Sequence, residues 1–356
     1  MREETVRPPG RLRPIYERWK ALKEALQRLD REGIPTEILG ANRHRARPTD
    51  SADVTCWQPA VATLDAMRIL HLSDTHLYGD PTARHYGRID TAAALRGVLD
   101  RLAGLEGVDL VVHSGDASED GTVESYRRLH ALLDPFGATL GAPLVVAMGN
   151  HDVPAAYAQV AGPGDHDPRY QDRVITTVGG ARAVVLDSSV PGAGYGHLDP
   201  AQLEWLRSVL AEPSVGGTVL VVHHPPLTAA TRMLRALDLD GMDELAEVLV
   251  GTDVRAILSG HYHHEMTGQL AGIPVHVTPG ITNVVDPVAA GDHERSLALS
   301  GASILQIDAN GTAPGIITSL WPNAGDTGGD AGGDVRVPVY DFGPEDVQAI
   351  IDAAGR

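Results

Sequence analysis

One stretch decides the fold of this chain: Ile69-Leu70-His71-Leu72-Ser73-Asp74-Thr75-His76. Its apolar start is typical of a buried strand, and the run ends in a carboxylate and an imidazole. Four further stretches repeat the design, each an apolar run that stops at residues able to bind metal: LVVHSGD (110–116), LVVAMGNHD (144–152), VLVVHHPP (219–226) and AILSGHYH (256–263). In open α/β sheets, ligands gather at the carboxyl ends of the strands. Five such strand ends therefore predict one shared site, which we interpret as a site for two metal ions.

The residues at these strand ends divide into ligands for two ions. A pair of ions needs at least one bridging carboxylate. Asp116 is placed to bridge, because its strand is expected to lie next to the first strand. A lone Asp-X-His or Gly-Asp is an ordinary turn, so the prediction depends on the joint occurrence at five strand ends. The predicted first ion is held by Asp74, His76 and His263, the bridge is Asp116, and the second ion is held by Asn150, His223 and His261.

The ligand types restrict which metals fit. Mixed ligation by Asp, Asn and His suits Fe, Mn, Zn, Co or Ni and disfavours Mg or Ca, which prefer oxygen ligands. Two ions carry more positive charge than two aspartates neutralise. The surplus attracts a phosphate anion and lowers the pKa of bound water. The sequence therefore predicts two divalent or trivalent metal ions, with Fe, Mn, Zn or Co as the candidates.

One histidine is assigned to catalysis rather than to ligation. His151 directly follows Asn150, so we expect its ring to project over the site, where both residues would bind substrate. As a donor, His151 could stabilise developing charge or protonate the leaving oxygen. Asp152 is expected to assist catalysis by holding the tautomer of His151. Three further histidines are candidates for the rim or for a supporting contact, and His224 is also a weak candidate for binding substrate: His85, His224 and His264.

Composition and charge exclude several classes of function. The net charge of −18 argues against unaided binding to a nucleic acid polymer or an acidic membrane, but bound metal ions would still attract a small phosphodiester substrate. Cys56 is the single cysteine, so no intrachain disulfide is expected and a cytoplasmic location is the default. The polar opening and the lack of about 18 consecutive apolar residues predict neither a secretion signal nor a membrane span. A phosphate-binding Gly-rich loop and a Gly-X-Ser-X-Gly elbow are also missing from the sequence.

The chain divides into three expected parts. Residues 1–66 form an N-terminal extension, with an amphipathic helix over 11–32 followed by a linker. Residues 67–322 alternate strands with helical windows at 89–102, 123–133, 200–210 and 242–249, which predicts an α/β fold with paired sheets between helices. Residues 323–356 form a Gly/Asp linker and a tail, in which Val335 to Phe342 is expected as an edge strand and Pro344 opens a helix.

The motifs resemble those of the calcineurin-like metallophosphoesterases, whose ordered blocks are D-X-H, G-D, G-N-H-[D/E], H and G-H-X-H. The corresponding residues here are Asp74-Thr75-His76, Gly115-Asp116, Gly149-Asn150-His151-Asp152, His223 and Gly260-His261-Tyr262-His263. The resemblance covers roughly residues 67 to 320. It implies a four-layer α/β-β/α sandwich with two mixed sheets, Asp116 as the bridging ligand, and a hydroxide held between the ions as the nucleophile. It also allows a homodimer.

Within that family, the His-His-Pro-Pro block at 223–226 is most similar to bacterial class III cyclic-nucleotide phosphodiesterases, in which the first histidine is the ligand. Ser118 and Glu119 depart from the Ala and Asp that this group often carries after the bridging aspartate. The resemblance implies hydrolysis of 3′,5′-cyclic nucleotides, above all cAMP to AMP. A glycerophosphodiesterase, a 2′,3′-cyclic nucleotide phosphodiesterase and a broad phosphatase are the alternatives. A non-catalytic scaffold is disfavoured because Asn150 and His151 are both present. The loops expected to set specificity are 77–88, 153–173, 192–197 and 281–293.

Overall fold

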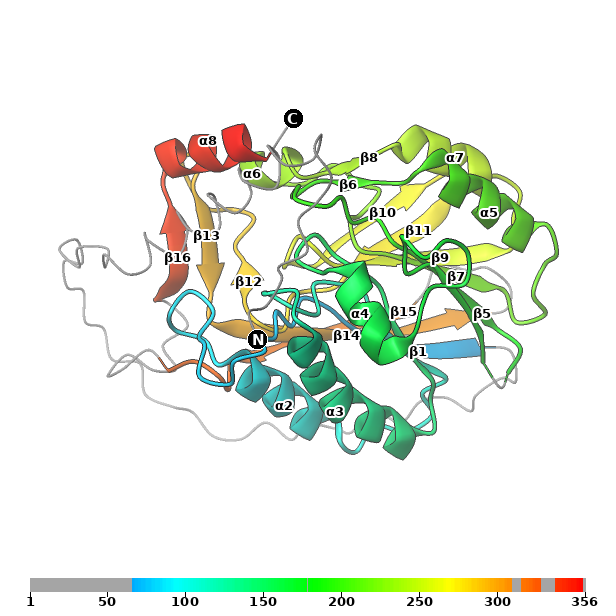
Figure 1. Cartoon of the computed structure of the whole chain (residues 1–356), viewed down its shortest axis with the longest axis horizontal. Coiled ribbons are helices and arrows are strands. Elements are labelled where there is room, and N and C mark those ends of the chain that lie inside the picture. Colours follow the sequence, from blue (N-terminus) through cyan, green and yellow to red (C-terminus); the bar gives the residue numbers. More distant parts are fainter. Residues whose placement is uncertain (1–65, 178, 309–314, 328–336, 355–356) are drawn as a thin grey trace, which may run out of the picture.

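The computed structural model describes residues 66–177, 179–308, 315–327 and 337–354. Its main body has four layers, in which two sheets lie face to face between two layers of helices (Figure 1). The helix predicted over 11–32 and most of the Gly/Asp linker lie outside the described residues. The four-layer sandwich that the motifs predicted is therefore confirmed.

The first sheet is mixed. Three parallel strands carry the predicted ligand runs, and two antiparallel strands extend them at one edge. In spatial order the strands are β15 (Gly315–Pro322), β14 (Leu299–Asp308), β1 (Ala66–Leu72), β2 (Leu110–His113) and β3 (Leu144–Val146). Two helices cover its outer face, α2 (Thr91–Leu102) and α3 (Val123–Leu140). Along β1 the side chains alternate, so that Ile69 points to the other sheet while Leu70 packs against the helices.

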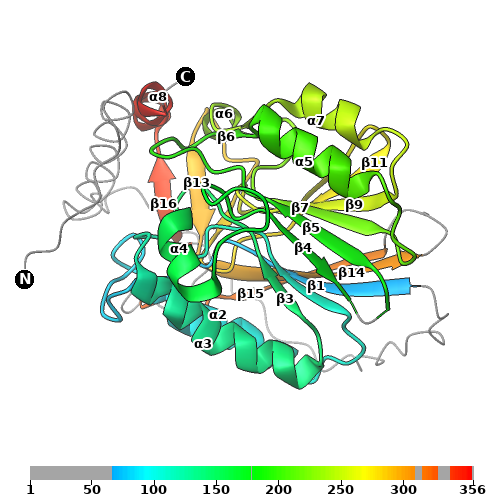
Figure 2. The ribbon, with the colours of Figure 1, turned by 45° about the vertical axis from the view of Figure 1, so that its right-hand side comes forward.

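The second sheet is also mixed, with antiparallel strands at both edges. Its order is β10 (Met266–Leu270), β11 (Ile273–Val277), β9 (Val254–Ser259), β7 (Thr218–Val222), β5 (Arg182–Leu186) and β4 (Arg173–Thr176). The outer layer here is α5 (Pro200–Leu210) and α7 (Met242–Leu249), which Figure 2 shows lying over the strands. Apolar residues fill both the space between the two sheets and the space under these helices.

The helical windows predicted from the sequence are present. Those at 200–210 and 242–249 have the predicted bounds, and Asp90 caps α2 through a hydrogen bond from the backbone N–H of Ala93 (3.0 Å). The window at 123–133 continues to Leu140. The loop expected over 153–173 instead contains α4 (Pro154–Ala161), of which only Tyr157 is buried. Almost all of its residues are apolar, so the sequence shows no contrast between an apolar and a polar face there.

The C-terminal residues build a smaller unit beside the sandwich. β16 (Pro338–Phe342) pairs with β13 (Glu294–Leu297), which pairs with β12 (Val284–Val285), so the predicted edge strand is present. After it, α8 (Pro344–Ala353) packs Val347 and Ile350 against Met233 and Leu234 of α6 (Arg232–Arg235). Two short strands, β6 (Gly196–His197) and β8 (Leu239–Asp240), pair above the second sheet. Where the C-terminal tail docks could not be predicted from the sequence, and the separation of this tail from the catalytic domain stays a prediction.

Candidate metal centre

The carboxyl ends of the central strands from both sheets meet at one place. The loops after β1 and β2 are joined by hydrogen bonds from Asp74 N to Gly115 O and from His76 N to Asp116 O, both 3.0 Å. The second sheet reaches the same place, because the backbone N–H of His261 donates to the Asp74 carboxylate (3.2 Å). Residues from distant parts of the sequence thus line one buried edge, as the strand-end pattern predicted.

One group of side chains matches the ligands predicted for the first ion. Asp74, His76, Asp116 and His263 each offer an oxygen or nitrogen, and these atoms lie within 4.8 Å of one another. His76 Nε2 lies 3.1 Å from His263 Nε2, which in turn lies 3.4 Å from Asp74 Oδ1. Two ring nitrogens and a carboxylate thus face one point. Together they could coordinate one metal ion.

Asp116 connects this group to the second. Its Oδ2 lies 3.6 Å from His76 Nε2 and 3.4 Å from His223 Nε2, so one oxygen faces a histidine of each predicted ion. His223 and His261 lie within the same kind of cluster. Several buried side-chain atoms of the described residues lack a hydrogen-bond partner, and two of them belong to predicted ligands, His223 Nε2 and Asn150 Oδ1. Buried polar atoms normally have partners, so these two fit a metal ion.

The second nitrogen of each predicted histidine ligand is anchored by an acceptor. Such outer contacts fix the tautomer and the ring orientation, and they leave the inner nitrogen with a lone pair for a metal ion. The anchoring contacts are His76 Nδ1 to Glu119 Oε2 (2.9 Å), His223 Nδ1 to Ser114 O (2.8 Å), His261 Nε2 to Leu237 O (3.1 Å) and His263 Nδ1 to Asn283 O (3.2 Å). The rings of the predicted histidine ligands are therefore oriented by contacts within the chain itself.

The backbone at the site is strained. Left-handed conformations are uncommon for residues with a side chain, and they persist where the surrounding structure enforces them. In the part of the chain that the structure describes, most of the non-glycine residues in this conformation are predicted ligands: Asp74 (φ 56°), His76 (44°), Asp116 (50°), His261 (67°) and His263 (52°). The close approach also requires Gly149, since a Cβ there would lie 2.2 Å from Asp116 Oδ1. Strain of this kind marks the edge as functional.

The two aspartates and His223 are electrostatically coupled. Burial raises the pKa of Asp74 to about 6, opposed by His223 and reinforced by Asp116. Burial also disfavours ionisation of Asp116, but His223 and His151 outweigh it and hold the pKa of Asp116 well below its usual value. For His223, burial would lower the pKa, yet the Asp116 carboxylate raises it to about 9. The two carboxylates therefore stabilise positive charge at this position.

The structure changes the predicted partner of His151. Its Nδ1 lies 2.9 Å from Glu119 Oε2, the same oxygen that anchors His76. The Asp152 carboxylate instead accepts backbone N–H groups of Ala117 (3.1 Å), Ser118 (2.9 Å) and Gly149 (2.9 Å). Asp152 therefore ties the loops after β2 and β3 together, and the expected contact with His151 was wrong.

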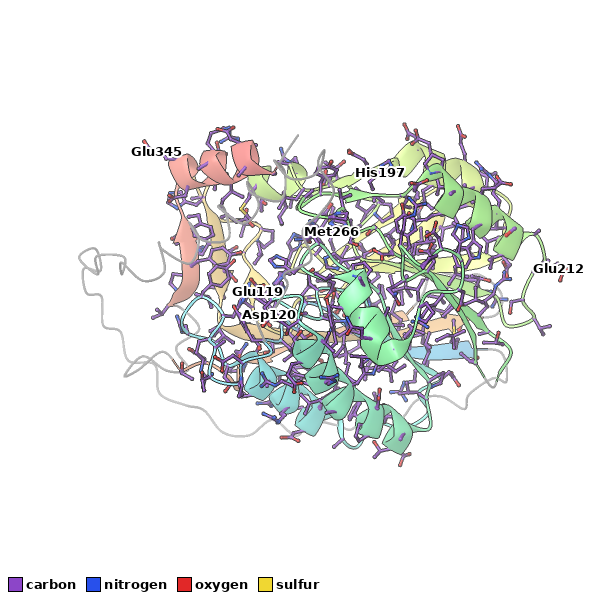
Figure 3. The ribbon with its side chains drawn as sticks, viewed as in Figure 1. Glu119, Asp120, His197, Glu212, Met266 and Glu345 are labelled. Atoms are coloured by element: carbon purple, nitrogen blue, oxygen red, sulfur yellow. The ribbon has the colours of Figure 1, made fainter. Side chains whose placement is uncertain are left out.

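Glu119 is the residue that sequence reasoning missed. It is 6% exposed, and Figure 3 shows it inside the outline of the molecule, whereas Glu212 and Glu345 lie at the margins. The available signal is its position three residues after Asp116, where the sequence departs from the pattern of its relatives. Its carboxylate forms a hydrogen bond with His76 and lies at ion-pair distance from His151.

The three remaining histidine candidates lie in different settings. His224 is fully buried, and its Nδ1 and Nε2 lie 2.8 Å from Ser188 Oγ and 3.3 Å from Gly194 O, which leaves the predicted substrate contact without support. His264 Nδ1 lies 3.0 Å from Glu265 O. His85, by contrast, stacks directly on His76.

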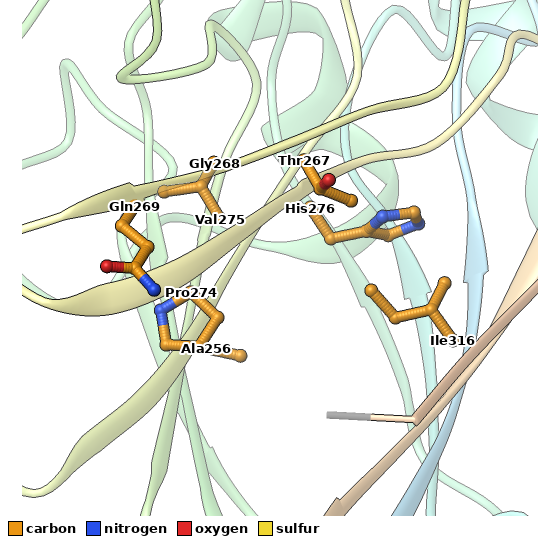
Figure 4. A pocket seen from close by; sticks show the side chains of 8 residues that line it. All are labelled: Ala256, Thr267, Gly268, Gln269, Pro274, Val275, His276 and Ile316. Atoms are coloured by element: carbon orange, nitrogen blue, oxygen red, sulfur yellow. The ribbon is translucent and has the colours of Figure 1, made fainter. Parts of the chain in front are cut away.

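A hollow elsewhere in the molecule is not the site. It has a volume of about 370 Å³ and is lined by residues of β9, β10, β11 and β15, among them His276 and Ile316 (Figure 4). It contains none of the predicted ligands. We place the chemistry at the strand ends, where the carboxylates and imidazoles converge.

The fold and the site define a metal-dependent phosphoesterase. The sequence profile of the calcineurin-like phosphoesterases matches residues 67–265, and the chain belongs to this family. The predicted family, fold and hydrolase class are therefore confirmed. So is the prediction of two metal ions, because members of the family use two divalent ions and the His/Asp cluster fits them. Within the described residues, every helix is too short or too polar to cross a membrane.

Several curated relatives match most of this domain. The cAMP/cGMP dual specificity phosphodiesterase of Mycobacterium tuberculosis is 39% identical over 242 residues, which cover 67% of this chain and 75% of the relative. A probable cyclic nucleotide phosphodiesterase of Rhodococcus erythropolis is 39% identical over 210 residues, covering 59% and 69%. The 3′,5′-cyclic adenosine monophosphate phosphodiesterase CpdA of Pseudomonas aeruginosa is 33% identical over 222 residues, covering 61% and 77%.

Proposed function

We propose that this protein hydrolyses 3′,5′-cyclic nucleotides, with cAMP as the main substrate and the 5′-monophosphate as the product. The observation that carries the proposal is the joint cluster of Asp74, His76, Asp116 and His263 with His223 beyond the shared Asp116. This geometry suits a phosphodiester held across two ions. The choice of a cyclic nucleotide is supported by the relatives described above, each of which is named for that activity.

The chain's own residues then have distinct roles. Bound metal ions would supply Lewis acidity and a solvent-derived nucleophile near neutral pH. Asp74, His76 and His263 would hold one ion, and Asn150, His223 and His261 the other, with Asp116 facing both. Because the ring nitrogens behind these ligands are anchored, little reorganisation is needed when substrate binds.

His151 is the residue assigned to the leaving group. Its side chain is 20% exposed, more than that of His76, His223 or Asp116, so it can reach a bound substrate. Glu119 beside Nδ1 orients the ring, and we assign Nε2 to the substrate. In the hydrolysis, a water oxygen bonds to phosphorus and the bond from phosphorus to the 3′ oxygen breaks. His151 donates a proton to that oxygen, and Asn150 helps to position the phosphoryl group.

A substrate panel tests the proposal. The full chain, reconstituted with Mn²⁺, is assayed with cAMP, cGMP, 2′,3′-cyclic AMP, glycerophosphocholine and an aryl monophosphate, and the products are separated by chromatography. We expect 5′-AMP from cAMP at the highest kcat/KM of the panel. Faster hydrolysis of glycerophosphocholine, of the 2′,3′-cyclic nucleotide or of the monoester would overturn the choice of substrate in favour of that alternative.

The compartment and the assembly are part of the same proposal. A cytoplasmic location is supported by the single cysteine, Cys56, which cannot form an intrachain disulfide. A homodimer follows only from the family resemblance. Cell fractionation tests the first, and light scattering on the purified full chain tests the second. Recovery in an extracellular fraction, or a monomer mass across the working concentration range, would contradict them.

A further inference from the structure

His85 contacts the metal centre without being one of its predicted ligands. The ring stacks on that of His76, with centroids 4.9 Å apart and an angle of 29° between the planes. Its Nδ1 lies 3.9 Å from Glu119 Oε2, the oxygen shared by His76 and His151, and 3.3 Å from the Tyr78 hydroxyl. The side chain is 7% exposed, so it borders the ligand rather than the solvent. It closes one face of the His76 ring.

A tight turn presents His85 to that face. Two backbone hydrogen bonds join His85 and Ile89: the N–H of each residue donates to the carbonyl oxygen of the other, at 2.9 Å. Between them, Tyr86 (φ 48°) and Gly87 (φ 63°) adopt left-handed conformations. Such a conformation is strained at Tyr86 and persists only when neighbouring contacts enforce it. The turn therefore needs an external support.

The C-terminal residues supply that support. The Arg88 guanidinium donates to both oxygens of Asp326, from Nε at 2.6 Å and from Nη2 at 2.7 Å, and Nη1 donates to Pro338 O at 2.9 Å. Paired bonds of this type are strong and directional. The side chains of Arg88 and Asp326 are 13% and 2% exposed, and the Tyr86 ring packs on Tyr340 at 4.8 Å. Figures 1 and 2 both show the loop between β1 and α2 beside β16.

The Arg88–Asp326 ion pair, which we call the clamp, includes a residue outside the part of the chain that matches the family. The family match ends at residue 265, so Asp326 and β16 lie beyond it. A support needed only to close the domain could consist of apolar contacts. Here a buried ion pair, which is costly to desolvate, holds a turn whose first residue, His85, stacks on the predicted ligand His76. Outer contacts that orient a ligand commonly change metal affinity.

We propose that His85 is a positioning residue for the metal ligand His76, and that the Arg88–Asp326 pair holds it there by joining the turn to the C-terminal segment. The inference rests on the metal centre of the proposed function. It predicts that a residue outside the family match controls the affinity of the centre for one of its two ions.

The test measures metal binding directly. The full chain is stripped of metal and titrated with Co²⁺, and the visible absorption reports the occupancy of each site. His85→Ala and Asp326→Asn are expected to lower the affinity for one of the two Co²⁺ ions by about 10-fold or more. The affinity for the other ion should stay within about twofold of the wild-type value. Activity on cAMP then provides a second reading, in which kcat falls more than KM rises.

Asp253→Asn is the matched control. It breaks an ion pair with Arg182 whose side chains are also buried (11% and 13% exposed) but which lies at the other ends of the strands. We expect this variant to lose thermal stability and keep both Co²⁺ affinities. The proposal is overturned if Asp326→Asn and Asp253→Asn bind Co²⁺ alike, or if His85→Ala binds both ions as the wild type does.

Two readings keep the test decisive. If His85→Ala fails to fold by circular dichroism, His85→Gln and Asp326→Asn decide the outcome by the same criterion. If the wild type binds two Co²⁺ ions, loses one selectively in the variants and yet leaves cAMP intact, the substrate proposal fails and the positioning role stands. If all variants match the wild type in Co²⁺ binding and cAMP is hydrolysed, the positioning role alone fails.

Discussion

The two ends of the strand sandwich differ in the partners of their buried carboxylates. At the amino ends of β5, β7 and β9, the Asp253 carboxylate accepts from Arg182 (3.1 Å), Ser214 N (2.8 Å) and Thr218 Oγ1 (2.8 Å), so its charge is matched by donors. At the carboxyl ends, Asp74 and Asp116 face histidines across gaps of 3.4 to 3.6 Å.

The contrast shows which end is built for stability and which for function. Buried polar groups stabilise a fold when every member has a partner, whereas a partly matched network is costly. The strained backbone of Asp74, Asp116 and His261 occurs at the same end as the unpartnered atoms His223 Nε2 and Asn150 Oδ1. A fold tolerates such a combination where a ligand supplies the missing interaction. Variants of the partly matched groups at the carboxyl end should therefore alter metal binding and rate, whereas variants of fully matched groups, such as Asp253 at the amino end, should alter stability.

The largest effect is expected from Asp116→Asn. The neutral amide removes the one charge that faces histidines of both predicted ions. Since loss of an outer contact already costs about 10–100-fold, loss of this residue should lower kcat/KM for cAMP by more than about 100-fold. Elemental analysis by mass spectrometry should find fewer than two ions per chain. A variant with two bound ions and unreduced kcat/KM would show that Asp116 does not bridge.

His151→Ala should come next. Losing a general acid typically costs about 100-fold or more in kcat, and the metal content should not change because His151 is not a predicted ligand. An ester with a p-nitrophenolate leaving group needs no proton, so its hydrolysis should fall much less than that of cAMP. Equal losses on both esters would contradict the role assigned to His151.

Glu119→Gln and Asp152→Asn form a third, smaller pair. The Glu119 carboxylate lies 2.9 Å from ring nitrogens of both His76 and His151, so its loss should cost about 10-fold in kcat and shift the pH–rate profile. The Asp152 carboxylate binds backbone amides, so Asp152→Asn should lower the melting temperature and leave the profile in place. The reverse pattern would restore Asp152 as the partner of His151.

These cases show how far the sequence could lead. The convergence of the predicted ligands at one edge could be expected because each follows an apolar run, and the carboxyl ends of neighbouring strands share an edge. The bounds of α5 were predictable because Asp199 and Pro200 start it, and the Asp199 carboxylate accepts from the N–H of Ala201 (3.0 Å). The pairing of His76 with Glu119 spans 43 residues. No local sequence pattern predicts a contact over such a separation. The pair of Arg88 and Asp326, 238 residues apart, could not be predicted for the same reason.

The smallest effect expected concerns the stability of the metal-free protein. The Asp116 carboxylate raises the pKa of His223 from 6.5 to about 9, against the opposing effect of burial. A histidine with a raised pKa contributes stability that is fully present below pH 6.5 and is lost as the pH rises through about 9. The melting temperature of the metal-free chain should therefore fall by roughly a few degrees between pH 7 and pH 9.

The metal-loaded protein is the control. Bound metal ions require neutral His223, so the loaded protein should show no such fall, and His223→Asn should remove the fall from the metal-free protein. Parallel calorimetric melting curves of the two forms check this, and an identical fall in both would place the titrating group away from the metal centre.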